Sequence, residues 1–435
     1  MKNFSPIRGT NDYMPKEAKI REIVRQKILT SYQNNGYNLI STPILENIEL
    51  LNMSDGGDNL KLMFKTVKRG DKLDLTKENL TVDDIVEEGL RYDLTVPLAR
   101  FYANNREKLP NPFKAIQIDY SFRAERPQRG RLRQFTQCDI DVFGDRTINA
   151  ELDLLKTALD TYNSLGFEKL TLKINDRRIL SALMSAAGFK EEEFSSVCVA
   201  LDKIDKVGIN GMMMELIEKG KEAESINKLV DILNDVIENG LKAVEKYGAE
   251  IKVVEDLKYL IETLNKLTKN QFEIIFDISI IRGQGYYTGT VFEFYCEGLT
   301  SAIGGGGRYD KMIEKMVGID IPAVGASMGF ERISLISASS IEKEKKYPVK
   351  VSVDIGKITI SCTNQTGDAK EELFVSSEGK NMEAGFNPKY FLDALKVIDD
   401  EEVFVDFGSN ISPCVIRPVD EGEFTYMILP IRLKE

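Results

Sequence analysis

One short segment of the chain concentrates positive charge. Residues 122–135 read FRAERPQRGRLRQF and hold five arginines in fourteen positions, whereas the whole chain of 435 residues has a formal net charge of -11. Arginine binds phosphate and carboxylate oxygens through a planar fork of N–H donors. The segment therefore predicts a site for a strongly anionic ligand such as a phosphate chain. The alternative interpretation is a solvated hairpin tip.

The composition removes several kinds of chemistry. The chain contains no histidine, so a Ser-His-Asp triad, a Cys-His pair and a His-ligated zinc are excluded. Its five cysteines lie far apart in the sequence, which fits neither a zinc site nor a disulfide framework and indicates a reducing, cytoplasmic setting. No apolar run is long enough to predict a membrane span. The chemistry must therefore use carboxylates, arginines, tyrosines and magnesium.

The arginines need elements that hold them in place. KAIQIDYSFRAE (114–125) and QFTQCDIDVFG (134–144) alternate well enough to predict two strands, with the arginine segment in the loop that joins them. Residues 177–266 have a helical pattern rich in Lys and Glu, which indicates a helical insertion. IEKEKKYP (341–348) is a charged linker, and a domain boundary is expected at about 338–348.

The arginine segment also resembles a known motif. FRAERPQRGRLRQFTQCDIDVFG (122–144) is similar to motif 2 of class II aminoacyl-tRNA synthetases, in the form found in the histidyl-tRNA synthetase family. Other segments resemble the same family in the same order over about residues 1–336. They are RGTNDYMP (8–15), GYNLISTPILE (36–46, motif 1), LRYDLTVPLAR (90–100), RGQGYYTGTVFE (282–293), GGGRYD (305–310) and GASMGFERI (325–333, motif 3).

This resemblance implies an α+β fold with a class II synthetase domain over residues 1–176 and 267–337. That domain would contain an antiparallel six-stranded sheet flanked by helices, and the insertion would occupy residues 177–266. Motif 1 of the family builds the dimer interface, so a homodimer is expected. A small α+β domain would follow over residues 338–435.

The resemblance further implies that arginines bind ATP. Arg123 would hold the α-phosphate and the reacting carboxylate oxygen of the substrate, and Arg282 would be a second α-phosphate donor where other class II enzymes use a metal. The remaining ATP contacts would come from Glu125 to the adenine amino group, Arg131 to the outer phosphates and Arg332 to the adenine and the γ-phosphate. Such fixed charge stabilises a phosphoryl transition state. Mg²⁺ would bridge the pyrophosphate oxygens, and no metal site made by protein side chains alone is expected.

The histidine pocket implied by the resemblance is rich in polar groups. Gln137 and Asp141 would bind the α-ammonium group of the substrate. The two imidazole nitrogens would be satisfied by Asp93, Tyr287 and Tyr309, with Thr95 close by. A buried partner left unsatisfied penalises any substrate that lacks the matching group. For the tyrosines, core packing is the alternative interpretation.

Two departures from the family pattern bear on this pocket. The family usually has Leu-Asp where this chain has Gln284-Gly285, just before the tyrosine pair. That change removes a carboxylate and, because of the glycine, allows the backbone more conformations. The family also commonly has histidine where this chain has Thr136.

The end of the chain does not resemble the α/β anticodon-binding domain of the family. Residues 351–433 instead resemble the C-terminal part of the bacterial DNA polymerase III β sliding clamp, notably in GFNPKYFLDAL, SPCVIRPVD and YMILPIRL. Met427, Leu429, Pro430 and Ile431 match positions that form part of a peptide pocket in the clamp. From residue 341 onward twelve Lys/Arg oppose eighteen Asp/Glu, which disfavours binding to nucleic acid.

Three functions remain open from the sequence. The first is a histidine–tRNA ligase that acts on histidine, ATP and tRNA(His). The second is a histidine-sensing paralogue, without ligase activity, that resembles the regulatory subunit of ATP phosphoribosyltransferase. The third is a module that recruits a protein partner through the C-terminal segment, for which a purely structural tail is the favoured alternative. Retention of Arg123, Arg131, Arg282 and Arg332 favours the first function, whereas the missing anticodon domain favours the second.

Overall fold

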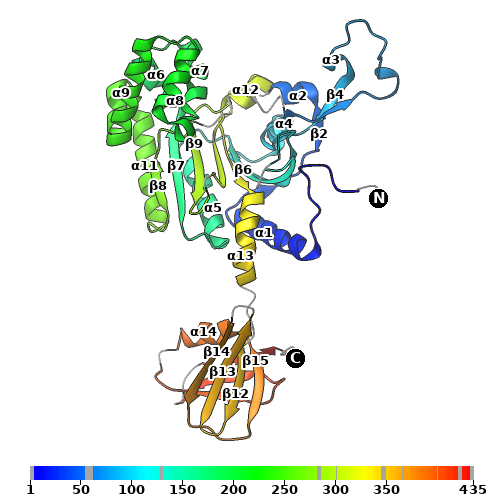
Figure 1. The fold of residues 1–435 in the computed structure, drawn as a ribbon, viewed down its shortest axis with the longest axis vertical. Helices are drawn as coiled ribbons and strands as arrows, with labels where there is room; N and C mark the ends of the chain where they lie inside the picture. Colours follow the sequence, from blue (N-terminus) through cyan, green and yellow to red (C-terminus); the bar gives the residue numbers. More distant parts are fainter. Residues whose placement is uncertain are drawn as a thin grey trace. The chain divides into compact units, whose positions relative to one another are not determined.

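The chain forms two compact units, Met1–Ala338 and Ser339–Glu435, in a computed structural model (Figure 1). The structure describes residues 4–53, 62–127, 131–281, 286–299, 301–343, 349–364, 367–398, 400–419 and 424–431. In the described helices no segment is long and apolar enough to cross a membrane. The two units are treated separately below.

A large mixed sheet organises the first unit. Across the described residues it has eight strands in the order β1 (Asn38–Leu39), β5 (Phe113–Phe122), β6 (Gln134–Phe143), β11 (Ala323–Gly329), β10 (Gly304–Arg308), β9 (Thr290–Cys296), β7 (Leu170–Asp176) and β8 (Glu273–Phe276). The six central strands are antiparallel to their neighbours, and β1 and β8 add one parallel strand at each edge. The α+β class with a six-stranded antiparallel core is thus confirmed.

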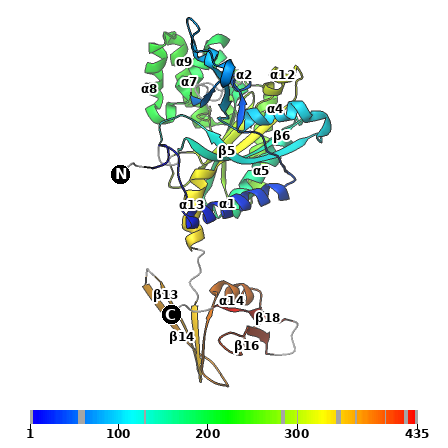
Figure 2. The ribbon, with the colours of Figure 1, turned by 90° about the vertical axis from the view of Figure 1, so that its right-hand side faces the viewer.

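Helices cover the sheet on both faces (Figure 2). Helices α1 (Pro15–Asn34) and α5 (Asn149–Ser164) pack together on one face, where the Tyr32 hydroxyl donates to the Cys138 carbonyl. Helices α4 (Thr95–Asn105) and α12 (Lys311–Val317) pack on the other face. There Tyr102 stacks on Phe143 with ring centroids 4.4 Å apart. Since successive strand residues point to opposite faces, odd-numbered β6 residues face α4 and α12.

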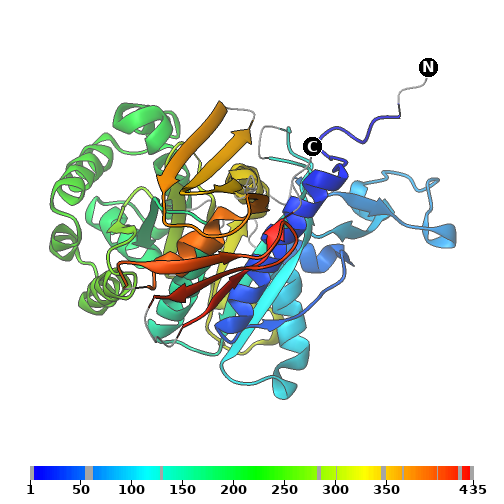
Figure 3. The same ribbon diagram turned by 90° about the horizontal axis from the view of Figure 1, so that it is seen from below.

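Two peripheral parts lie at opposite ends of this sheet (Figures 1 and 3). One is a small three-stranded sheet of β2 (Leu45–Asn47), β4 (Val86–Leu90) and β3 (Lys65–Val67), with α2 (Ile48–Met53) and α3 (Val82–Ile85) beside it. The other is helical and comprises α6 (Arg177–Ala186), α7 (Phe194–Leu201), α8 (Ile204–Glu218), α9 (Ala223–Asn239), α10 (Leu241–Val244) and α11 (Ile251–Leu267). Apolar residues at helical spacing form its core, for example Leu229, Leu233 and Val236 of α9.

Helix α13 (Phe330–Lys343) begins at the end of the motif 3 segment and continues past the boundary between the units. The second unit contains two antiparallel sheets. The first has the order β14 (Gly367–Phe374), β13 (Lys357–Asn364), β12 (Val349–Asp354), β15 (Met382–Phe386), β19 (Pro430–Ile431), and the second is β16 (Val403–Phe407), β17 (Cys414–Pro418), β18 (Tyr426–Ile428). Helix α14 (Pro388–Leu395) completes the unit, and Phe386, Cys414 and Ile416 are fully buried in its core.

Candidate active site

Strand β6 supplies a row of polar side chains on the face that α4 covers. Gln137, Asp139 and Asp141 are every second residue of this strand, and all three are buried. They lie opposite Gly329, Ser327 and Gly325 of β11 in the strand register. A Cβ added at Gly325 would come within 1.9 Å of Asp141 Oδ1. Glycine is therefore required there because the backbone comes so close to the carboxylate.

Asp93 reaches the same region from the start of α4. It is 2 % exposed, and its Oδ1 accepts a hydrogen bond of 3.2 Å from the backbone N–H of Val96, as in a helix cap. Arg123 is attached to the same segment because its Nε donates to the Tyr92 carbonyl at 3.0 Å. Thr95, the first residue of α4, is partly buried beside it.

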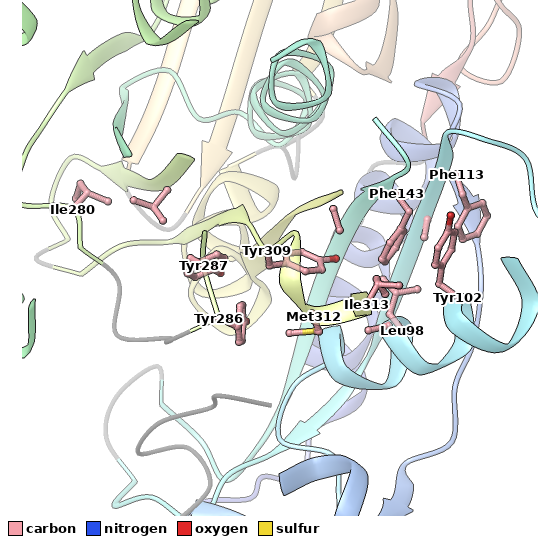
Figure 4. Packing of buried hydrophobic residues seen from close by; sticks show 14 residues of the cluster. Leu98, Tyr102, Phe113, Phe143, Ile280, Tyr286, Tyr287, Tyr309, Met312 and Ile313 are labelled. Atoms are coloured by element: carbon pink, nitrogen blue, oxygen red, sulfur yellow. The ribbon is translucent and has the colours of Figure 1, made fainter. Parts of the chain in front are cut away.

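Three tyrosines border the row of carboxylates. The Tyr309 hydroxyl donates to Asp141 Oδ1 at 2.5 Å, and both side chains are buried. Figure 4 shows Tyr286, Tyr287 and Tyr309 grouped together, with the Tyr309 hydroxyl pointing away from the other two rings. The rings of Tyr286 and Tyr287 are 4.8 Å apart. The tyrosine group thus adjoins the row of β6 carboxyl groups at Asp141.

Burial shifts the protonation of all three carboxyl groups. Burial raises the pKa of Asp141 to about 7; the Tyr309 hydrogen bond opposes the shift, and the Asp93 charge adds to it. Burial also raises the pKa of Asp93 to about 6, against the lowering effects of the Val96 N–H and the Arg123 charge. The pKa of Asp139 is raised well above its usual range, first by burial and then by the Asp141 charge. A site that crowds buried carboxyls in this way favours a cationic ligand.

Two cationic side chains lie near Glu125. Arg131 pairs with Glu125 at 3.5 Å. Burial lowers the pKa of Arg332, and the Arg131 charge lowers it further, while Glu293 and Glu125 oppose the shift. The Arg131 and Arg332 guanidinium groups are therefore near enough to repel each other, as expected of a place built for a polyanion.

A network of hydrogen bonds holds Glu331, the neighbour of Arg332, and Arg332 itself donates to the Ala302 carbonyl. Its neighbour Glu331 accepts two hydrogen bonds from Arg21 of α1, at 2.7 and 2.9 Å, and a third from the Thr136 backbone N–H at 3.0 Å. The Tyr13 ring lies 3.9 Å from the Arg21 guanidinium carbon. These contacts join α1, β6 and the start of α13.

The structure places the predicted residues in two groups. In the first, Asp141 bonds to Tyr309, Gln137 lies on the same face of β6, and Arg123 is bonded to the residue before Asp93; Thr95 and Tyr287 adjoin them. The second group consists of Glu125, Arg131 and Arg332. Arg282, Gln284 and Gly285 lie outside the described residues. In the described residues no group of three or more Cys, Asp or Glu side chains could hold a metal ion.

Two residues at this site were not predicted from the sequence. Asp139 lies between Gln137 and Asp141, and the alternation along QCDID could have revealed it because residues two apart share a strand face. Arg21 gave no such signal. It lies on a helix in which charged residues are common, and its partner Glu331 is 310 positions away in the sequence.

The chain is similar to two protein families and to individual members of one of them. The model of the family described as "Histidyl-tRNA synthetase" matches residues 9–333, and that of "DNA polymerase III beta subunit, C-terminal domain" matches residues 326–432. The histidine–tRNA ligase of Leifsonia xyli subsp. xyli is 38% identical over 342 residues, covering 76% of this chain and 79% of that protein. The probable histidine–tRNA ligase of Tropheryma whipplei (strain Twist) is 38% identical over 419 residues, covering 91% and 97%.

Solved structures share the fold at lower identity. The histidyl-tRNA synthetase of Nostoc sp. PCC 7120 has a TM-score of 0.64 and 22% identity, and the match covers 99% of this chain and 97% of that one. A protein from Bacillus halodurans C described as an ATP phosphoribosyltransferase regulatory subunit/histidyl-tRNA synthetase has a TM-score of 0.63 and 20% identity, with 76% and 83% covered.

Proposed function

Because the chain belongs to the histidyl-tRNA synthetase family, we propose that it is a histidine–tRNA ligase, which activates histidine with ATP and transfers the histidyl group to tRNA(His). One observation carries the proposal. Three buried carboxyl groups, at Asp93, Asp139 and Asp141, act on one another electrostatically, and the Arg123 guanidinium group acts on two of them. A cationic amino acid would lie against the carboxyl groups, and a phosphate group against Arg123.

In the first reaction the histidine carboxylate oxygen attacks the α-phosphorus of ATP. The bond from that phosphorus to the oxygen shared with the β-phosphate breaks, and pyrophosphate leaves. Arg123 is suited to neutralise the α-phosphate because the backbone carbonyl of Tyr92 holds its Nε, which leaves the other guanidinium donors free to turn toward the ligand. Electrostatic preorganisation of this kind is the main catalytic resource for the step.

The outer part of ATP would lie on the second group of charges. Arg131 is suited to the β- and γ-phosphates and Arg332 to the adenine face and the γ-phosphate, while Glu125 would accept from the adenine amino group. Their mutual arrangement supports these roles, because Glu125 contacts Arg131 and both act on Arg332. Mg²⁺ would accompany ATP as part of the substrate and bridge its phosphate oxygens. Arg282 remains a proposed α-phosphate donor by family resemblance alone.

The contacts in the pocket suggest how imidazole is recognised. Tyr309 and Asp141 are already joined by a hydrogen bond, so we assign this pair, with Tyr287, to the imidazole ring of the substrate. The sequence resemblance assigns Asp141 to the α-ammonium group and Asp93 to the ring. The bond between Asp141 and Tyr309 supports exchanging these two roles, with Asp93 proposed for the ammonium group. Thr95 would support Asp93 at the start of α4.

In the second reaction a hydroxyl of the terminal ribose of tRNA(His) attacks the histidyl carbonyl, and AMP leaves. All strand pairs described in the second unit are antiparallel, unlike an α/β anticodon domain. The acidic balance of this segment is also unsuited to RNA. We therefore propose that tRNA is recognised mainly through its acceptor end by the first unit.

A homodimer is proposed from the motif 1 region. Three apolar side chains of that region are unusually exposed, Leu39 at 47%, Ile44 at 38% and Leu45 at 41%. A hollow of about 630 Å³ lies alongside, lined among others by Leu39, Arg21 and Phe330. Exposed apolar patches of this kind mark protein interfaces. Sedimentation of the purified protein would show a dimer, and a monomer at micromolar concentration would contradict this part of the proposal.

Histidine-dependent exchange of pyrophosphate into ATP tests the activation step. Exchange with histidine, and none with other amino acids, would support the ligase. Tight histidine binding without exchange would instead support the histidine-sensing alternative. Charging of tRNA(His) transcripts tests the second step separately.

A further inference from the structure

Arg91 lies between β4 and α4 and carries a buried positive charge that the proposed function does not use. Its side chain has no exposed surface, and among the described residues it is the largest side chain that is fully buried. A buried charge is costly unless it is paired and hydrogen-bonded. The partners of this guanidinium group therefore show what the charge holds in place.

Each nitrogen of the Arg91 guanidinium group contacts an acceptor from another segment. Nε donates to the Tyr120 carbonyl of β5 at 2.8 Å. Nη1 donates to the Thr42 carbonyl at 2.8 Å and to the Pro43 carbonyl at 3.3 Å. Nη2 lies 2.8 Å from Asp119 Oδ2 in an ion pair, although this contact is not aligned as a hydrogen bond. The group thus joins the motif 1 segment to the end of β5.

The Arg91 backbone is held on the same two sides. Its N–H donates to the Ile44 carbonyl at 2.9 Å, and its carbonyl accepts from the Phe122 N–H at 3.0 Å. The Thr42 hydroxyl accepts from Arg91 Nη1 at 3.2 Å and from Gln117 Nε2 at 3.1 Å. Main chain and side chain therefore fix one position for Arg91 relative to β5.

The next residue, Tyr92, makes the contact to Arg123. The Tyr92 carbonyl accepts from Arg123 Nε at 3.0 Å, and the Tyr92 side chain is only 1% exposed. Arg123 directly follows β5, and the Arg91 guanidinium group holds Tyr120 near the end of that strand. The strand that carries Arg123 and the carbonyl that orients it are therefore both fixed by Arg91.

We propose that Arg91 is a positioning residue for Arg123. It fixes the Tyr92 carbonyl and the end of β5 relative to each other, so that the Arg123 guanidinium group meets the α-phosphate in one orientation. This inference rests on the proposed function and deepens it. Arg91 does not reach the ligand, since its nitrogens are engaged with protein groups. A guanidinium group is needed because its donors point to separate acceptors in one plane, whereas a lysine ammonium group is one compact charge.

The change Arg91→Lys tests this role. It keeps a positive charge near Asp119 but cannot reach the Tyr120 and Thr42 carbonyls together. We expect the rate of histidine-dependent pyrophosphate exchange to fall by about tenfold, because a small displacement of a transition-state donor is costly. Rates are compared at a temperature where circular dichroism shows each variant to be folded. An unchanged rate would overturn the inference.

A double-mutant cycle with Arg123→Lys separates positioning from general support of the fold. Arg123→Lys keeps a positive charge but loses the planar group that the Tyr92 carbonyl orients. If Arg91 acts through Arg123, adding Arg91→Lys to this variant should lower the rate by less than about twofold. A further loss of about tenfold in the double variant would overturn the inference, since Arg91 would then support the site independently of Arg123.

A matched control is Arg308→Lys, which changes another buried arginine of the same unit. Arg308 pairs with Glu151 and donates to the carbonyls of Asp145 and Thr147, which are not residues that hold Arg123. Whatever loss this variant causes should therefore be the same with and without Arg123→Lys. A loss that vanishes in the Arg123→Lys background would mean that the cycle does not single out Arg91, and it would overturn the inference.

Thr42→Val keeps the test available in case Arg91→Lys does not fold. This change removes only the hydroxyl that Arg91 and Gln117 share. We expect a loss of about threefold in the exchange rate, which should vanish in the Arg123→Lys background. An equal loss in both backgrounds would overturn the inference. If the unmodified protein shows no histidine-dependent exchange, the proposed function itself fails, which is a different result.

Discussion

Arg21 and Glu331 join two distant parts of the chain through two parallel hydrogen bonds of 2.7 and 2.9 Å. The side chains are only 14% and 10% exposed. Glu331 immediately precedes Arg332 at the start of α13, so this pair fixes the direction from which Arg332 reaches the proposed nucleotide site. Arg21 does not reach the ligand in this account and acts by positioning.

Replacing Arg21 by Ala should therefore affect both stability and ATP binding. The variant leaves Glu331 partly buried without its cation, and we expect a loss of about 2 kcal/mol in the free energy of unfolding. The KM for ATP should rise by about tenfold, with a smaller change in the KM for histidine, because a shifted Arg332 contacts only the nucleotide. Urea unfolding and exchange kinetics measure the two effects.

A matched control lies one turn further along the same helix. Arg25 pairs with Glu22 at 3.7 Å, and both side chains are exposed at 37% and 64%. Replacing Arg25 by Ala should cost less than about 0.5 kcal/mol. Equal effects of the two substitutions would contradict a special role for Arg21.

Tyr309→Phe removes the donor to Asp141 and keeps the ring. The buried carboxyl group then lacks its partner, and the pKa of Asp141 should rise further above about 7, because the Tyr309 hydrogen bond lowers it. We expect kcat/KM for histidine at neutral pH to fall by about tenfold to a hundredfold. Steady-state exchange kinetics across pH would show the loss. An unchanged kcat/KM would exclude this pair from imidazole recognition.

The raised pKa of Asp141 also predicts a pH dependence of stability. In the unfolded chain its ordinary pKa of 3.8 applies, whereas the folded value is about 7. The folded state therefore holds more protons between these values, and its stability falls as the pH rises through this window. Asp141→Asn should remove that contribution, so the variant should gain about 4 kcal/mol relative to the unmodified protein as the pH rises from 4 to 7. Urea unfolding of both proteins at several pH values measures this difference. A difference in the free energy of unfolding that does not change with pH would contradict the prediction, because it would mean that the pKa of Asp141 is not raised.

Gly325→Ala tests the close approach of β11 to β6. The added Cβ would lie 1.9 Å from Asp141 Oδ1 and 3.2 Å from Tyr309 Cε1, so the Asp141–Tyr309 pair must move. Overpacking of this kind costs about 1–3 kcal/mol, and histidine affinity should fall with it. Gly408→Ala in the second unit, where the nearest atom is Ser412 Cβ at 3.2 Å, serves as the control and should leave histidine affinity unchanged.

The C-terminal unit makes its own prediction. Met427 and Leu429 are 71% and 67% exposed, so Leu429→Asp should change neither the unfolding temperature nor the exchange rate by a measurable amount. If Leu429 belongs only to a partner-binding surface, this variant leaves the enzyme activity intact. A large loss of exchange would mean that the segment around β18 and β19 supports the catalytic unit directly.

The sequence predicted the fold well where local patterns are strong. The alternation over residues 114–125 and 134–144 predicted the hairpin that became β5 and β6. The parallel pairing of the edge strands β1 and β8 could not be predicted from local patterns. They are only two and four residues long, and their pairing depends on contacts far away in sequence.

The candidate site could be predicted residue by residue only as far as the motifs reach. Asp93, Gln137 and Tyr309 came from the motifs, and all three side chains are buried in the first unit. Which carboxylate faces which substrate group could not be read from the motifs, because it depends on the hydrogen bond between Tyr309 and Asp141. Such pairings between elements depend on the packed sheet and have no local signature.

Buried carboxylates and arginines are proposed to activate histidine with ATP. Histidine-dependent exchange of labelled pyrophosphate into ATP measures this most directly, with Arg123→Ala as the paired variant. We expect exchange that requires histidine and a loss of about a hundredfold or more in the variant, as for removal of a main transition-state donor. Absence of exchange from folded protein that binds histidine and ATP, or full exchange in Arg123→Ala, would contradict it.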